Sequence, residues 1–120
     1  MNYDIKDIKL ADKGKKRIDW AKNDMPVLAQ ILEKFSKNKP FKGLKMSACL
    51  HITAETANSA RTLKAGGADI VLCASNPRST QDDVAASLVT HDKIPVYAIK
   101  GEDKKTFFKH LNAAIKHNPK

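Results

Sequence analysis

The sequence predicts an α/β protein built on a parallel β-sheet. Three short apolar runs recur along the chain, at residues 45–50, 69–74 and 95–99. None of them alternates between apolar and polar side chains, which is typical of parallel strands that are buried on both faces. The segments between them are long enough for one helix and two short loops, the spacing of βαβ units. We therefore expect a three-layer fold with a parallel sheet, a flavodoxin- or Rossmann-like half-domain, preceded by two N-terminal helices.

The first 40 residues predict these two helices. Their apolar side chains recur every three or four residues, the pattern of a helical face; they are Ile18, Ala21, Met25, Leu28, Leu32 and Phe35. Pro26 would break a single helix, so we expect two helices that meet at residues 24–26, with Asp24 close to the second cap. The chain is then a single domain, with a helical arm at residues 1–40 and three βα units at residues 41–120.

Each predicted strand is followed by a predicted helix. Thr53 is a suitable N-cap for a helix that ends at the glycine pair 66–67. Ser79 and Asp82 have the spacing of a capping box, which predicts a helix over residues 79–89. The third helix begins after the last strand, and its expected apolar face is formed by Phe107, Phe108, Leu111, Ala114 and Ile115.

The length and the charge of the chain argue against two classes of protein, specific nucleic-acid-binding proteins and membrane proteins. A chain of 120 residues has room for one hydrophobic core. Its formal net charge is +9, but the excess is mostly lysine near both ends, and aromatic residues are only 6%. Nucleic-acid-binding proteins usually concentrate basic residues and interleave them with aromatic ones, so we interpret the charge as solvated helix faces and expect no specific nucleic acid. The absence of a long apolar run predicts a cytoplasmic protein with no membrane partner.

The two cysteines lie in the first two apolar runs, at Cys49 and Cys73. We expect both to be buried free thiols, since framework disulfides come in denser sets in short secreted chains. Cys49, His51 and Cys73 lack the paired spacing and the fourth ligand of a zinc site, so we predict no metal.

Polar residues are concentrated directly after the first two strands, at residues 50–55 and 75–82. Because ligands of open parallel sheets bind beyond the carboxyl ends of the strands, these two loops are the candidate site. The chain has no glycine-rich phosphate loop and no nucleophile elbow, and the glycine pair 66–67 precedes a strand instead of opening a helix. The residues alone therefore predict a small-ligand-binding α/β domain.

Each candidate residue also has a purely structural interpretation. His51 is a proton shuttle, a ligand to substrate hydroxyls or a structural histidine. Thr53 and Ser79 are equally compatible with plain helix caps, and Glu55 with compensation of a helix dipole. Asn76 is compatible with a simple turn. All of these residues directly follow the first two strands. This shared position favours a ligand-binding site over a separate structural role for each residue.

Two sequence blocks at the candidate site are specific enough to indicate a family. They are the Leu-His-x-Thr block at residues 50–53 and the Ser-Thr-Gln-Asp block at residues 79–82. Further matching segments lie at residues 8–14, 24–26, 41–45, 67–69 and 94–102. Together they resemble the S-adenosyl-L-homocysteine hydrolases (adenosylhomocysteinases), over nearly the whole chain and within the N-terminal part of that family's substrate-binding domain.

The resemblance implies a soluble homotetrameric enzyme that hydrolyses S-adenosylhomocysteine reversibly to adenosine and homocysteine. In the family, bound NAD oxidises the ribose 3′-hydroxyl, homocysteine is eliminated, water adds and the ketone is reduced again. The family's main catalytic residues and its NAD-binding fold lie on segments that follow Lys120. We therefore expect this chain to be a fragment with no bound NAD, inactive on its own, whose partners are the rest of the enzyme and a nucleoside thioether.

The resemblance also implies roles for individual residues. Thr53 and Glu55 match positions that meet the purine edge, and His51 matches a supporting catalytic histidine near the ribose and the sulfur. The substrate-binding residues implied are Leu50, His51, Thr53, Glu55, Ser79 and Gln81, with Asn76, Thr80 and Asp82 behind them. Glu55 can accept from the adenine amino group or from N1–H of hypoxanthine, so an S-inosylhomocysteine hydrolase is an alternative. A stand-alone nucleoside-binding module is another.

Overall fold

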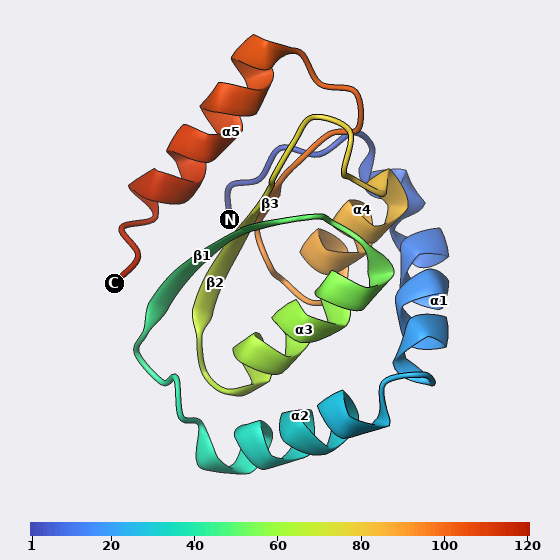
Figure 1. The fold of residues 1–120 in the computed structure, drawn as a ribbon, viewed down its shortest axis with the longest axis vertical. Helices are drawn as coiled ribbons and strands as arrows, with labels where there is room; N and C mark the ends of the chain where they lie inside the picture. Colours follow the sequence, from blue (N-terminus) through green and yellow to red (C-terminus); the bar gives the residue numbers. More distant parts are fainter.

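The computed structural model describes residues 1–120 and confirms the predicted α/β class (Figure 1). Its three strands are parallel and follow the order β1-β2-β3 across the sheet. The strands are β1 (Lys45–Leu50), β2 (Asp69–Ala74) and β3 (Val96–Tyr97). The sequence therefore located the first two strands correctly, whereas the third is shorter than the predicted 95–99. Pro95, directly before β3, has no N–H to donate to a neighbouring strand.

The helices lie on both sides of this sheet (Figure 1). After a short 3-10 turn (Ile8–Leu10), the helices are α1 (Ala11–Lys22), α2 (Pro26–Asn38), α3 (Ala54–Ala65), α4 (Asp82–Thr90) and α5 (Lys104–Lys116). α3 and α4 cover one face, α1 packs against both of them, and α2 packs against α3. α5 alone covers the opposite face, which completes the three layers. None of these helices is both long and apolar enough to span a bilayer.

The two N-terminal helices meet where the sequence predicts. α1 ends at Lys22, and α2 begins at Pro26, where the first turn of a helix tolerates the missing N–H. Met25 is the N-cap residue of α2, so Asp24 lies next to the cap as expected, and no side chain caps this helix. Ile18 of α1 is completely buried, so α1 contributes directly to the core.

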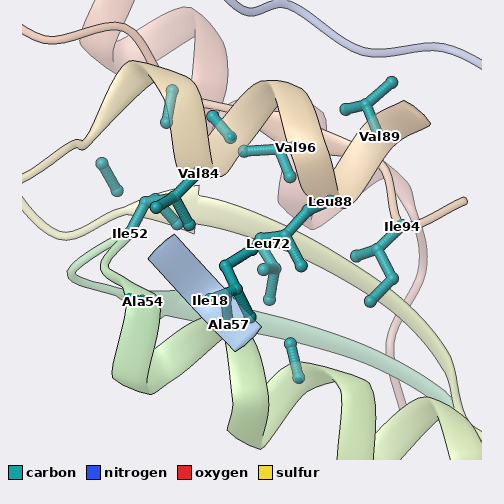
Figure 2. Close-up of a cluster of buried hydrophobic side chains, with 14 of the residues drawn as sticks. Ile18, Ile52, Ala54, Ala57, Leu72, Val84, Leu88, Val89, Ile94 and Val96 are labelled. Atoms are coloured by element: carbon teal, nitrogen blue, oxygen red, sulfur yellow. The ribbon is translucent and has the colours of Figure 1, made fainter. Parts of the chain in front are cut away.

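One hydrophobic core lies between β2 and the helices on the α3 side of the sheet (Figure 2). Leu72 of β2 belongs to the same buried cluster as Ile18, Val84 and Leu88. Each of these four side chains is at most 1% exposed. Burial of a side chain of this size stabilises a protein by roughly 1.5–3 kcal/mol, so this cluster holds α1 and α4 against the sheet.

β1 differs from its predicted environment. β2 is buried from Ile70 to Ala74, but β1 is half-exposed because no strand pairs with its outer edge. Cys49 of β1 is consequently exposed, and the prediction of two buried thiols is wrong for it, whereas Cys73 of β2 is 1% exposed.

The outer side of β3 is bonded to the N-terminal segment. Asp4 N donates to Val96 O at 3.0 Å, and Ala98 N donates to Asp4 O at 3.0 Å. This parallel bridge joins Asp4, near the N-terminus, to Tyr97 of β3. It satisfies backbone groups that an unpaired third strand would leave open.

The predicted start of α4 is wrong by three residues. The helix begins at Asp82 with Gln81 as its N-cap, and Ser79 and Asp82 do not form a capping box. Ile52 N donates to Ser79 O at 2.9 Å, and Gln81 N donates to Ile52 O at 2.8 Å. These bonds to the loop after β1 hold residues 79–81 extended, so the helix cannot start at Ser79.

The buried face of α5 is only partly the predicted one, since Phe107 and Leu111 are half-buried as expected. Phe108 and Ile115 are 50% and 68% exposed, whereas His110 is 1% exposed. Two carboxylates flank His110 in the folded chain, and such long-range partners are invisible to an analysis of apolar spacing. Ala114 is the apolar residue of the predicted face that is fully buried.

Candidate functional site

The loops that follow the three strands are joined to one another at the carboxyl edge of the sheet. Residues Ile52 and Thr80 form a parallel bridge between the first two loops. Lys100 N of the third loop donates to Asp82 Oδ1 at 3.0 Å, and Gly101 N donates to Pro77 O at 2.7 Å. The candidate residues of the first two loops therefore belong to one hydrogen-bonded edge, in agreement with the rule for parallel sheets.

The first loop positions its residues through the start of α3. Thr53 is the N-cap, as predicted: Thr56 N donates to its Oγ1 at 3.4 Å, and Thr53 N donates to Thr56 Oγ1 at 2.9 Å. Thr56, which sequence analysis missed, thus takes the place of the usual Glu or Gln of a capping box. His51 and Glu55 are exposed and have no ion-pair partner within the chain, while Leu50 is half-buried against the core.

Glu55 lies in the first turn of α3, where the helix dipole favours its carboxylate. A carboxylate accepts hydrogen bonds only, and both of its oxygens are free here. The side chain can therefore bind a donor group of a ligand at this edge. Dipole compensation and ligand binding are compatible roles for the same residue.

The second loop is tied to the first by Gln81. Its Oε1 accepts from Ala54 N at 3.2 Å, so the side-chain amide reaches the N-terminus of α3. Because this bond uses the amide oxygen, the NH₂ group remains available as a donor. Ser79 Oγ donates to Asn76 O at 3.1 Å, which is a turn contact and not the predicted cap.

Of the three residues expected behind the binding residues, Thr80 is buried, Asp82 is half-buried and Asn76 is exposed. Asn76 Oδ1 accepts from Arg78 N at 2.9 Å, which shapes the turn after β2. Thr80 is 3% exposed, and its hydroxyl is buried without a partner. Asp82 connects the second and third loops through the bond from Lys100 N.

The buried carboxylate of Glu102 holds the third loop through a hydrogen bond from the backbone of Ile99. Ile99 N donates to Glu102 Oε2 at 3.2 Å, and His110 Nδ1 of α5 lies 2.7 Å from the same oxygen. Burial raises the pKa of Glu102, although the charge of His110 and the Ile99 amide act in the opposite direction. Sequence analysis missed this pair, because its members come from a loop and from the middle of a helix.

The surface hollows with volumes of about 250 to 420 Å³ lie in other regions of the chain. The hollow of about 420 Å³ is formed by residues of α5. The hollow of about 370 Å³ lies between Met1, Tyr97 and His117. No group of three His, Cys, Asp or Glu side chains is arranged to hold a metal ion. The candidate site is thus an open edge that offers hydrogen-bonding groups.

The glycines of the chain do not form a glycine-rich dinucleotide-binding loop for NAD. Gly67 precedes β2 at φ +95°, and a Cβ there would lie 2.9 Å from Lys42 Cα, so this glycine is required for packing. Gly101 is the glycine that follows a strand at the site edge, and a Cβ there would meet nothing within 4 Å. A dinucleotide fingerprint needs several glycines between a strand and a helix, which the residues present do not supply.

Known proteins resemble this chain along nearly its whole length. The family model for S-adenosyl-L-homocysteine hydrolase matches residues 2–120. The chain belongs to the S-adenosyl-L-homocysteine hydrolase family. Among its relatives are proteins named adenosylhomocysteinase from Aquifex aeolicus, Thermosynechococcus vestitus and Sulfurisphaera tokodaii, which are 63%, 58% and 49% identical to it over 119 residues. Each match covers 99% of this chain and 28% of the relative.

Membership of the hydrolase family confirms the resemblance in the sequence. The chain spans 28% of the length of the adenosylhomocysteinases it matches. The two specific blocks, at residues 50–53 and 79–82, lie on the two loops that the Ile52–Thr80 bridge connects.

Proposed function

We propose that this chain is the part of an adenosylhomocysteinase that binds the nucleoside of the substrate. The enzyme would hydrolyse S-adenosylhomocysteine reversibly to adenosine and homocysteine. The observation that carries this proposal is the bonded edge between the first two loops, on which Glu55 and His51 remain exposed and unpaired. Family membership supplies the substrate class.

The proposed contacts follow from the hydrogen-bonding capacity of each side chain. Glu55 accepts from the amino group of the purine, and Gln81, whose oxygen is held by Ala54 N, donates through its NH₂ group. Thr53 and Ser79 form the neighbouring wall, with Leu50 as its apolar part. His51 lies toward the ribose and the sulfur, where an imidazole can accept or donate a proton near neutral pH.

The remaining machinery is proposed to lie outside residues 1–120. No residue of this chain is assigned to NAD. We infer that these residues form a single domain, with residues 1–40 as a helical arm and residues 41–120 as three βα units. We infer further that the complete enzyme assembles as a cytoplasmic homotetramer, in which this segment meets the rest of the hydrolase.

Replacing Glu55 by alanine is expected to weaken adenosine binding by about 1–3 kcal/mol, or roughly 5- to 150-fold in Kd. The physical reason is that the purine amino group loses its acceptor. A suitable host is the Aquifex aeolicus adenosylhomocysteinase with its matching segment replaced by residues 2–120. Calorimetric titration with adenosine, and with inosine in parallel, measures Kd for the two purines.

The control for this experiment is Glu33→Ala, which removes a carboxylate on α2 that pairs only with Lys37 at the surface. Its Kd should equal that of the unmodified chimera. An unchanged Kd in the Glu55→Ala variant would remove Glu55 from the site. Stronger binding of inosine than of adenosine would favour the alternative substrate.

The isolated 120-residue chain is expected to release no homocysteine from S-adenosylhomocysteine, even with added NAD. The reason is that the catalytic groups proposed to lie outside residues 1–120 are missing from the isolated chain. A thiol assay corrected for Cys49 and Cys73 measures the product, with the chimera as positive control. Release of homocysteine above the blank would contradict the proposal that the main catalytic groups lie outside residues 1–120.

A further inference from the structure

The two cysteines of the chain face each other across adjacent strands. Cys49 of β1 and Cys73 of β2 are register partners in the parallel ladder. Partners in register point to the same face of a sheet, and both residues line one hollow of about 250 Å³ beneath α5, with Leu111 and Ile115. Cys49 Sγ donates to Ala74 O at 3.6 Å, so its thiol turns toward β2. This arrangement makes the pair a dithiol, and not two isolated thiols.

The separation of the strands is suitable for a bond between the two sulfurs. Neighbouring strands lie about 4.8 Å apart, and a disulfide spans Cα separations of about 4.4–6.8 Å. One thiol of the pair is accessible and the other is not, because Cys49 is exposed and Cys73 is 1% exposed. An oxidant can therefore reach Cys49 first.

We propose that Cys49 and Cys73 form a redox modification site, in which a hydroperoxide converts the two thiols to a disulfide. The Cys49 thiolate attacks a peroxide oxygen, the O–O bond breaks, and a sulfenic acid forms on Cys49. The Cys73 sulfur then attacks the Cys49 sulfur, the Cys73 proton passes to the departing hydroxyl, the S–O bond breaks and water leaves. With hydrogen peroxide, the two sulfurs lose two electrons in total, and the products are one disulfide and two waters.

The environments of the two thiols set this order of reaction. Burial raises the pKa of Cys73 to about 12, and the neighbouring Cys49 thiol adds to the shift. Cys73 therefore remains protonated at neutral pH and is inert toward peroxide by itself. It becomes reactive only toward an electrophilic sulfur beside it, which is what the sulfenic acid on Cys49 provides.

The disulfide would close a loop of the chain that contains Thr53 and Glu55. It would also join β1 to β2 one residue before the ends of the two strands, at Leu50 and Ala74. The ends of the two strands that carry the candidate site would then be covalently fixed. The oxidation itself does not depend on the proposed function, because it is measured on the isolated chain.

The test is oxidation of the reduced 120-residue chain with hydrogen peroxide, followed by alkylation of free thiols and digestion with trypsin without reductant. Cleavage after Lys45, Arg61, Lys64 and Arg78 separates the two cysteines into peptides 46–61 and 65–78. Mass spectrometry is expected to find these peptides linked, in a protein that remains monomeric on a non-reducing gel. In the folded chain, linkage should be roughly ten-fold faster than in guanidinium chloride, because the fold aligns the sulfurs.

Two variants separate the steps. In Cys73→Ser, the linked peptide should disappear, and dimedone should trap several-fold more sulfenic acid on Cys49 than in the unmodified chain. In Cys49→Ser, which alters only an exposed position, Cys73 should stay reduced at the same peroxide dose. Thermal unfolding of both variants identifies any loss of structure.

Phenylarsine oxide provides a second measurement without an oxidant, since its arsenic forms two As–S bonds with a neighbouring dithiol and releases water. We expect one arsenical per unmodified chain, resistant to a monothiol wash, and none in either variant. The proposal is overturned if Cys49 in the folded chain goes to sulfinic acid while Cys73 stays free. It is also overturned if the linked peptides come only from dimers, or if the arsenical is lost on washing.

Discussion

Replacing His110 by alanine is expected to lower the free energy of unfolding by about 3–5 kcal/mol. His110 is 1% exposed, its Nε2 lies 2.7 Å from Asp4 Oδ2, and its Nδ1 lies 2.7 Å from Glu102 Oε2. The Glu102 side chain is 1% exposed, and its Oε1 has no hydrogen-bond partner. Alanine would leave this carboxyl buried with only the Ile99 amide for support, and Asp4 would lose its link to α5. Urea unfolding followed by circular dichroism measures the change.

The loss should depend on pH. Because the pKa of Glu102 is raised above its ordinary value of 4.5, the folded chain binds this proton more tightly than the unfolded chain. Its contribution to stability is therefore complete below that ordinary pKa and declines as pH rises through the folded pKa. Without His110 the neutral carboxyl is favoured further, so the variant should lose less stability in mildly acidic buffer than at neutral pH.

The control for His110 is His91→Ala. His91 Nε2 lies 3.0 Å from Asp12 Oδ1, but the Asp12 side chain is 90% exposed, so the loss should stay below about 1 kcal/mol. In the double variant His110→Ala with Glu102→Gln, part of the stability should return, since no charge then remains buried. A loss for His110→Ala no larger than that for His91→Ala would show that the buried pair does not anchor α5.

Gly14→Ala is expected to destabilise the chain by about 2–3 kcal/mol, although alanine normally favours a helix by about 1 kcal/mol. Gly14 lies where α1 crosses the start of α4. A Cβ at this position would lie 1.8 Å from Asp83 O and 2.9 Å from Val84 N. Both contacts are with backbone atoms, so no side chain can move aside and α1 must shift away from α4.

Such a shift would also disturb an ion pair between the same helices. Arg17 Nε of α1 lies 3.1 Å from Asp83 Oδ2, and Asp83 is 7% exposed. The measurement is the urea midpoint of Gly14→Ala against Lys16→Ala, an exposed substitution on α1 that should change stability by less than about 0.5 kcal/mol. Equal midpoints for the two variants would mean that α1 and α4 are not in close backbone contact.

Local patterns were sufficient for much of this fold. The apolar runs at 45–50 and 69–74 coincide with β1 and β2, and Pro26 separates α1 from α2 as expected. Thr53 caps α3 because a cap depends on residues only a few positions away. The sequence also predicted that the loops after β1 and β2 lie at one edge of the sheet, where the Ile52–Thr80 bridge joins them, since a parallel sheet brings the carboxyl ends of its strands together.

Other features depended on contacts between distant residues. Residues 79–81 have a helix-start pattern, but hydrogen bonds to Ile52 hold them extended. The apolar spacing of α5 indicates Phe108 and Ile115 as buried residues, but both are exposed, and the polar His110, which pairs with Asp4 and Glu102, is buried beside Ala114. In each case a tertiary contact outweighs a local preference of at most about 1 kcal/mol per residue.

By itself, the sequence determined the α/β class, the positions of β1 and β2, the order of the helices and the two loops of the candidate site. These features follow from periodicity, caps and chain topology, which are local or nearly local properties. Only the tertiary structure decided which edge of the sheet is open, how Gln81 joins α3, and that Cys49 faces Cys73. The physical reason is that register, burial and charge pairing are set by residues far apart in the chain, whose proximity exists only after folding.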